Sequence, residues 1–158
     1  MSNAKKLINE LAYRNLTIGS VESFTGGLFA KTLTDVSGAS KVFKGALVTY
    51  SNETKSNILG IPAEYIDEKG VVSAEVCQQM AIKGQKLLNV DVCVAFTGNA
   101  GPTVCQLNSE VGTCFMSIAY KGTMWSFPLK LEMERNTLRQ YCVDAVIDTV
   151  LSVVTQSN

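Results

Sequence analysis

The sequence contains no histidine, and this absence removes several kinds of active site. Many serine and cysteine hydrolases use a histidine as general base, so neither a Ser-His-Asp nor a Cys-His arrangement can form here. A catalytic zinc site also loses its usual ligand. Any general base must therefore be a lysine, an aspartate, a glutamate, a tyrosine or a chain terminus.

Long apolar runs and a net charge are missing too. No apolar stretch reaches the roughly 18 residues that a membrane span needs, and the first residues lack the apolar core of a signal peptide. Fourteen basic residues balance fourteen acidic ones, so no overall field attracts nucleic acid or an anionic membrane. We expect a cytoplasmic protein that contacts neither nucleic acid nor membrane.

The five cysteines are not arranged as a metal site, because their number is odd and no two have the spacing of a zinc knuckle. Cys105 lies in a polar segment and is expected to be the exposed thiol. The other four lie in apolar patterns, where a free cysteine behaves as a small hydrophobic residue. We expect no metal and no cofactor. These four cysteines are Cys77, Cys93, Cys114 and Cys142.

The length and the ordinary balance of 46% hydrophobic and 18% charged residues suit a single domain over residues 1–158. Helical and buried-strand patterns alternate along it. They predict a three-layer α/β/α domain with a mixed, largely parallel sheet and a late hairpin at Lys121-Gly122. The nearly continuous apolar run at 90–96 predicts a central strand. The helices are expected at 4–14, 28–33, 51–59, 62–67, 73–88 and 134–154, and the strands at 17–22, 43–50, 90–96, 112–120 and 123–131.

The turn between the first strand and the second helix carries two hydroxyls and two glycines, at Ser23, Thr25, Gly26 and Gly27. Backbone N–H groups at a helix start favour an anion, and glycines remove the Cβ atoms that would keep a ligand away. We therefore expect these N–H groups to face a ligand, with the Ser23 hydroxyl beside them. The alternative is that Ser23 or Thr25 only caps the helix.

Three predicted strands end in polar or glycine-bearing segments, and strand ends in such sheets form ligand crevices. Ser23, Tyr50 and Gly98 lie at these ends, and Lys55 lies in the helix after Tyr50. A serine is a poor nucleophile until a base takes its proton, and a lysine can take it once burial makes the amine neutral. Tyr50 can relay a proton, and backbone N–H groups of 23–27 or 98–101 can hold an oxyanion. The pattern indicates metal-free acyl transfer or amide hydrolysis.

Each of these residues also has a plainer interpretation. Lys55 can be a solvated helix residue, Tyr50 a strand residue packed in the core, and Asn52 a helix N-cap. Arg135 and Arg139 lie one turn apart near the start of the last helix and can form a solvated face. A cation near a helix start is electrostatically unfavourable, however, which makes Arg135 a candidate functional residue.

Three ordered motifs resemble the CinA C-terminal domain family, and the resemblance covers nearly the whole chain. It implies a nicotinamide-nucleotide amidase, which hydrolyses the carboxamide of nicotinamide mononucleotide to nicotinic acid mononucleotide and ammonia without a metal. It also implies a homo-oligomer. The motifs are Glu22-Ser23-Phe24-Thr25-Gly26-Gly27, then residues 45–50 with Ser51-Asn52-Glu53-Thr54-Lys55, then Thr97-Gly98-Asn99-Ala100-Gly101-Pro102.

The resemblance also implies roles for individual residues. Ser23 would be the nucleophile, Lys55 the base that activates it, and Tyr50 a proton-handling or orienting partner. Asn52 and Arg135 are further candidates for contacting the substrate. The remaining implied contacts are Thr25, Gly26 and Gly27 at the carboxamide or phosphate, and Thr97, Gly98, Ala100 and Gly101 on the opposite wall.

The motifs depart from the family pattern at three places. Phe24 stands where the family usually has cysteine, and Asn99 stands where it usually has isoleucine. Residues 103–106 replace a run of glycines that would let the backbone approach a ligand closely. These departures keep two other hypotheses open: a non-catalytic module that binds a nucleotide or a partner, and hydrolysis of another small amide.

Overall fold

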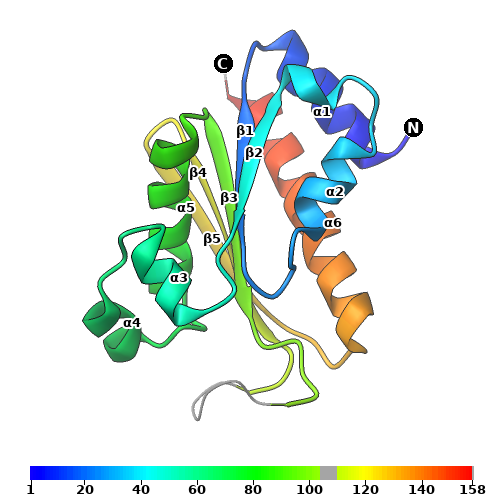
Figure 1. Cartoon of the computed structure of the whole chain (residues 1–158). Helices are drawn as coiled ribbons and strands as arrows, with labels where there is room; N and C mark the ends of the chain where they lie inside the picture. Colours follow the sequence, from blue (N-terminus) through cyan, green and yellow to red (C-terminus); the bar gives the residue numbers. More distant parts are fainter. Residues whose placement is uncertain (104–109, 158) are drawn as a thin grey trace.

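A computed structural model describes residues 1–103 and 110–157 and shows a sheet between two helical layers (Figure 1). The strands are β1 Ile18–Glu22, β2 Phe43–Val48, β3 Val92–Gly98, β4 Thr113–Tyr120 and β5 Thr123–Lys130, in the order β2-β1-β3-β4-β5. β1 pairs in parallel with β2 and β3, whereas β4 pairs antiparallel with β3 and β5. Only β4 thus opposes the other described strands, which confirms the mixed, largely parallel sheet with its late hairpin.

Helices cover both faces of this sheet (Figure 1). One layer holds α1 Asn3–Tyr13, α2 Leu28–Thr34 and α6 Arg135–Gln156. The other holds α5 Ala74–Leu88, with α3 Asn52–Asn57 and α4 Ala63–Lys69 beside it. A short 3-10 helix, η1 Ala39–Lys41, lies between α2 and β2. None of the helices in the described part of the chain is both long and apolar enough to cross a membrane.

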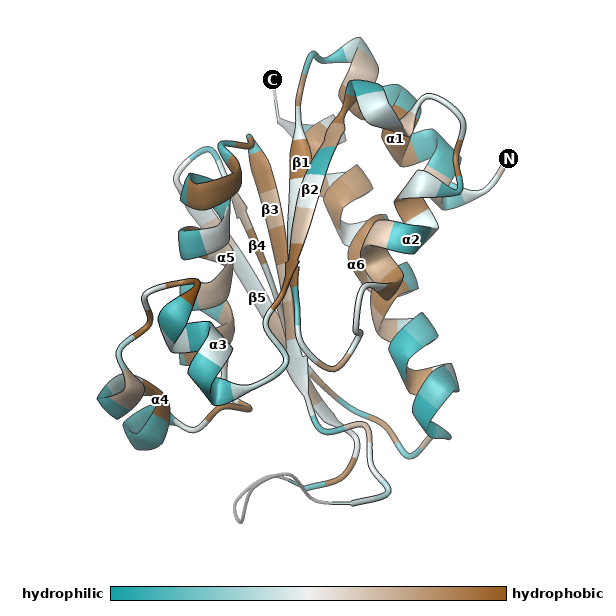
Figure 2. Ribbon diagram, viewed as in Figure 1, coloured by the Kyte–Doolittle hydropathy of each residue, from teal (hydrophilic) through white to brown (hydrophobic). Residues whose placement is uncertain are grey.

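Each face of the sheet has its own apolar core, and the hydrophobic colours of Figure 2 concentrate along the strands and the inward sides of the helices. β3 is buried along nearly its whole length, which confirms the predicted central strand. Phe29 of α2 packs on Phe96 of β3 with ring centroids 5.6 Å apart, and burying one such side chain contributes about 2 kcal/mol. Cys105 lies outside the described residues. The other four cysteines are free and buried, as expected: Cys77, Cys93, Cys114 and Cys142.

Several predicted strand boundaries shift by one or two residues, and local side chains explain two of these shifts. The strand predicted at 43–50 ends at Val48, since Ser51 caps α3 in a capping box. The strand predicted from residue 90 begins at Val92. Asp91 precedes it and accepts hydrogen bonds from the N–H and hydroxyl of Thr17, at 2.8 and 3.0 Å.

The parallel register places the C-terminal ends of β1, β2 and β3 at the same end of the sheet. Glu22, the last residue of β1, is level with Val48 on β2 and Phe96 on β3. The residues that follow these three positions therefore lie side by side, which is the condition that a shared site requires.

Candidate active site

Ser23 follows β1 directly and lies at the entrance of a tight turn. Its N–H donates to the carbonyl oxygen of Phe96 at 3.2 Å, and the residue is 7% exposed. Gly26 and Gly27 have φ values of 60° and 102°, a region that glycine enters without steric cost. Because Gly27 is also the N-cap of α2, this turn brings the chain back into a helix and leaves the Ser23 hydroxyl at the sheet edge.

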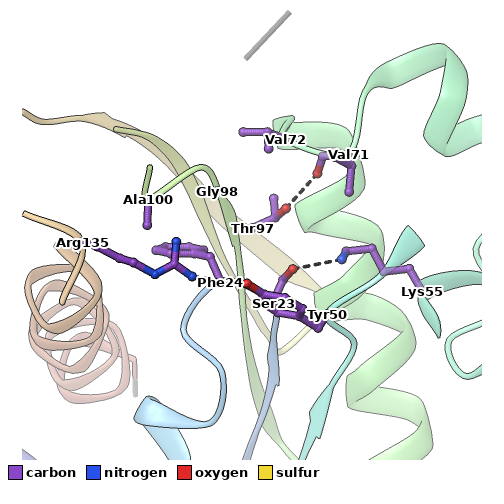
Figure 3. Close-up of a pocket in the computed structure, with 10 residues that line it drawn as sticks. All are labelled: Ser23, Phe24, Tyr50, Lys55, Val71, Val72, Thr97, Gly98, Ala100 and Arg135. Atoms are coloured by element: carbon purple, nitrogen blue, oxygen red, sulfur yellow. Dashed lines mark hydrogen bonds between the residues drawn. The ribbon is translucent and has the colours of Figure 1, made fainter. Parts of the chain in front are cut away.

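Lys55 of α3 is fully buried, so the solvated-helix interpretation is wrong. Its Nζ lies 3.0 Å from Ser23 Oγ (Figure 3) and 2.7 Å from the carbonyl oxygen of Thr49. A carbonyl oxygen can only accept, so one N–H of the amine points at Thr49. In the neutral amine this arrangement leaves the lone pair available to the Ser23 hydroxyl.

Burial lowers the pKa of Lys55 from 10.5 to about 8, because desolvation penalises the charged ammonium. The nearby Cys77 thiol acts in the opposite direction but is the smaller influence. With such a pKa, roughly a tenth of the amine is neutral at pH 7. Ser23 and Lys55 thus have the geometry and the ionisation of a nucleophile with an adjacent base.

A cavity of about 110 Å³ opens over the Ser23–Lys55 pair. Phe24, Val71 and Val72 give it apolar walls (Figure 3). The structure also brings to this cavity seven of the residues predicted from the sequence: Ser23, Tyr50, Lys55, Thr97, Gly98, Ala100 and Arg135.

Arg135, in the first turn of α6, joins two sides of the cavity. Its guanidinium donates to the carbonyl oxygen of Gly101 at 2.9 Å and to the Tyr50 hydroxyl at 3.3 Å. Tyr50 is 63% exposed, so the interpretation as a core residue is wrong. Gly101 reaches the site through this bond to Arg135 and does not itself line the cavity. A guanidinium at the rim can attract an anionic group of a ligand.

Comparison with known proteins gives the family. A family model described as "CinA C-terminal domain" matches residues 1–154. The chain belongs to the CinA C-terminal domain family.

The chain is similar to relatives of two different lengths. The "Protein MG115 homolog" of Mycoplasma pneumoniae is 39% identical over 97% of this chain and 95% of its own length. A "CinA-like protein" of Flavobacterium psychrophilum is 46% identical over 94% of this chain but only 34% of its own length. The chain therefore spans nearly all of the first relative and about a third of the second. A solved CinA superfamily protein from Klebsiella pneumoniae has the same fold, with a TM-score of 0.94 at 21% identity over 98% of this chain and 97% of that chain.

One expectation about the first CinA motif is wrong, because the N–H groups at the start of α2 do not face a ligand. Those of Phe29 and Ala30 donate to the buried carboxyl group of Glu22, at 2.9 and 3.1 Å. The N–H groups of Leu28 and Lys31 donate to carbonyl oxygens of the preceding turn. The whole first turn of α2 is therefore satisfied inside the protein.

Thr25, Gly26 and Gly27, which were predicted to contact the substrate, lie outside the cavity lining. The carbonyl oxygen of Thr25 accepts from the Arg139 guanidinium at 2.9 Å. The same guanidinium lies 3.1 Å from where a Cβ on Gly26 would be. Arg139 of α6 therefore supports the turn at residues 23–27, which follows β1, and is not simply part of a solvated face.

Asn52 is not brought to the cavity either. It is the first residue of α3 and is exposed, and the N-cap is Ser51, not Asn52 as one alternative had it. Asn52 lies instead in a separate hollow between α3 and α4, beside Ala63 and Asp67.

The structure accommodates two departures from the CinA pattern through contacts around the cavity. Phe24 packs against Gly98, where a Cβ would lie 3.0 Å from Phe24 Cε1 and 2.9 Å from Cys114 Sγ. Asn99 is fully buried, and its Oδ1 accepts from the N–H of Gly101 at 3.3 Å. In the third departure, residues 104–106 lie outside the described residues.

Sequence reasoning missed several parts of this site. Val71 and Val72 were not among the predicted site residues, yet they form one wall, where the Thr97 hydroxyl donates to the carbonyl oxygen of Val71 at 2.8 Å. Two valines before a helix cap carry no chemical signature, so only the fold reveals their position. Thr49 was missed because it contributes a backbone carbonyl, which every residue has.

Proposed function

We propose that this CinA-family domain is a metal-independent amidase that hydrolyses the carboxamide of nicotinamide mononucleotide to nicotinic acid mononucleotide and ammonia. The observation that supports this most is the 3.0 Å separation of Lys55 Nζ and Ser23 Oγ in a site where Lys55 is fully buried. The family resemblance supports the choice of substrate, and the depressed pKa of Lys55 supports its role as base.

The reaction begins when neutral Lys55 takes the proton of Ser23 and Ser23 Oγ attacks the carboxamide carbon. The lysine then gives this proton to the leaving nitrogen, which departs as ammonia and leaves an acyl group on Ser23. Lys55 then takes a proton from water, the hydroxide attacks the acyl carbon and the bond to Ser23 Oγ breaks. Lys55 returns the proton to Ser23 Oγ, and the carboxylate product leaves. The N–H groups of the first turn of α2 are occupied, so they do not hold the oxyanion. Gly98 and Ala100 line the opposite wall of the cavity, and their N–H groups are the donors that we propose.

The substrate is expected to enter with its carboxamide first. The carboxamide and pyridine ring lie among Thr97, Gly98 and Ala100, and the ribose phosphate extends past the rim. There Arg135 supplies a cation for the phosphate, and Tyr50 orients or relays a proton. Assembly into a homo-oligomer remains a prediction, which light scattering of the purified protein would test.

The direct test is ammonia release from nicotinamide mononucleotide by purified wild-type protein and by Ser23→Ala. Loss of a serine nucleophile is expected to lower kcat by at least about 1,000-fold, with an unchanged circular dichroism spectrum. Ser40→Ala, at an exposed position of η1, is the matched control and keeps wild-type activity. Equal ammonia release by wild type and Ser23→Ala would refute the mechanism.

Phe24 favours a second candidate function, because its ring lines the cavity beside Ser23 where the family usually has cysteine. In this alternative the domain binds the mononucleotide, or a partner, without turnover. Calorimetry beside the ammonia assay separates the two: heat of binding without ammonia supports the binding module, and turnover excludes it. Turnover of another small amide instead would keep the Ser23–Lys55 chemistry and change the substrate.

A further inference from the structure

Glu22 is a fully buried carboxyl group immediately before Ser23. Its Oε1 accepts from the N–H of Phe29 at 2.9 Å, and its Oε2 accepts from the N–H of Ala30 at 3.1 Å and from the Ser20 hydroxyl at 3.0 Å. None of the ion pairs formed by the described residues includes Glu22. Three donors and the positive end of a helix thus hold this group in place of a cation.

These contacts fix the path of the chain on either side of the nucleophile. The Glu22 main chain belongs to β1, while its side chain holds the second and third residues of α2, so residues 23–27 are fastened at both ends. The main-chain carbonyl of Glu22 also accepts from the N–H of Thr49 at 2.9 Å. The carbonyl of Thr49 in turn holds Lys55 Nζ. One residue therefore connects the support of Ser23 with the support of Lys55.

A capping role alone does not account for a glutamate at this position. Burying a carboxyl group away from water is unfavourable unless hydrogen bonds compensate, and shorter residues such as serine or aspartate usually satisfy a helix start. A glutamate on the neighbouring strand does more than cap, because it fastens that strand to the helix across the turn that carries Ser23. We propose that Glu22 is a positioning residue that sets the alignment of Ser23 Oγ with Lys55 Nζ; this inference depends on the amidase function proposed above.

The test uses the reaction of Ser23 with an arylsulfonyl fluoride, which does not depend on the substrate assignment. The Ser23 oxygen forms a bond to sulfur, fluoride leaves, and the serine proton passes to Lys55 and then to solvent. In Glu22→Gln, one of the two helix N–H groups must face an amide NH2 and lose its acceptor. Labelling of Ser23 is then expected to be at least about tenfold slower, and kcat for ammonia release to fall in proportion while KM stays within about twofold.

Two further variants separate alignment from charge and from stability. Glu22→Asp keeps the charge but is one methylene shorter and cannot reach both helix N–H groups, so slow labelling is expected again. Glu10→Gln is the matched control, since it weakens the 2.6 Å ion pair with Arg14 far from the site. It is expected to leave the labelling rate unchanged.

A Glu22→Gln protein that is folded and labelled as fast as wild type, even with a lowered Tm, would show a merely structural role and overturn the inference. A wild-type rate in Glu22→Asp would overturn it as well. Should Glu22→Gln not fold, Ser20→Ala decides, because it removes one of the three bonds to the carboxyl group. Labelling slowed by about two- to threefold supports alignment, and an unchanged rate contradicts it. Absence of labelling at Ser23 in the wild type would instead refute the amidase proposal itself.

Discussion

Two glycine-bearing turns follow the neighbouring parallel strands β1 and β3, and they have different structural roles. The turn after β1 carries Ser23, and the helix N–H groups that it leads into are all used inside the protein. The segment after β3 contributes Gly98 and Ala100 to the cavity wall. Similar sequence signals thus lead to a turn fixed by internal hydrogen bonds in one case and to part of a cavity wall in the other. The difference arises from Glu22, which occupies the first helix start from within.

The largest effect on ammonia release is expected at Lys55, the proposed base for Ser23 in the turn after β1. Lys55→Met removes the only group placed to activate Ser23 among the described residues that line the cavity, so ammonia release should fall by at least about 1,000-fold.

In the wild type, kcat/KM should rise with pH with a midpoint near 8, as Lys55 loses its proton. The measurement is ammonia release across pH 6 to 10, and a flat profile would exclude Lys55 as base.

The same variant has a predictable effect on stability. The folded pKa of Lys55 lies near 8 and below its ordinary 10.5, so the unfolded chain binds the proton more tightly. Stability therefore rises with pH between these two values, and the full cost, roughly 3 kcal/mol, is present below pH 8. Lys55→Met removes this cost but loses two hydrogen bonds, so a net gain of about 1 to 2 kcal/mol is expected at pH 7.

Urea denaturation at pH 7 and pH 10 measures this difference, which should shrink at the higher pH. An equal difference in stability between Lys55→Met and wild type at both pH values would show that the site holds the charged amine without cost. The proposal that burial makes Lys55 a base at neutral pH would then lose its electrostatic support.

The two turns should respond differently to a single added methyl group. Gly98→Ala places a Cβ 2.9 Å from Cys114 Sγ and 3.0 Å from Phe24 Cε1, so the wall must move. We expect a stability loss of about 1 to 3 kcal/mol and a fall in kcat/KM on the order of tenfold. Gly27→Ala meets only Val48 at 4.0 Å, and its cost comes from the φ of 102°.

For Gly27→Ala we expect a stability loss of about 1 to 2 kcal/mol, with a smaller change in kcat/KM than in Gly98→Ala. Thermal denaturation and steady-state kinetics on both proteins give the comparison. Equal losses of kcat/KM would mean that the β1 turn contacts the substrate after all.

The smallest effects separate the two arginines of α6. Arg135 lies at the cavity rim, whereas Arg139 braces the β1 turn through the carbonyl of Thr25. Arg135→Met is expected to raise KM for the mononucleotide by about tenfold. Arg139→Met should cost about 1 kcal/mol of stability with little change in KM, and a reversal of these two results would place the phosphate at Arg139.

Much of the fold and the proximity of the strand-end residues could be predicted because both depend on patterns along the chain. Apolar periodicity indicated the layers, and strand ends in a parallel sheet necessarily meet, which brought Ser23, Tyr50 and Gly98 to one edge. The sequence could not show whether Lys55 is solvated or buried, because a lysine in a short helix fits both. Gly26, Gly27 and Asn52, which were predicted to contact the substrate, lie outside the cavity lining for another reason.

Their positions follow from side chains whose direction only the fold determines. A helix start after two glycines is an anion site only if no internal acceptor reaches it, and Glu22 reaches it from the preceding strand. Asn52 and Ser51 are equally good caps by type, but the backbone selects Ser51. Neither choice is visible in residue types or spacing.

Thr49 accepts the hydrogen bond from Lys55 Nζ through its main-chain carbonyl oxygen, so no substitution at position 49 removes the acceptor atom. Thr49 is fully buried, so substitutions of similar volume would keep that carbonyl in place as long as the strand ends where it does. A shift of β2 by one residue against β1 would instead turn that carbonyl away and leave the amine without its guide. The hydrogen bond from Lys55 Nζ to Thr49 therefore depends little on which residue stands at position 49, but insertions or deletions in β2 would break it.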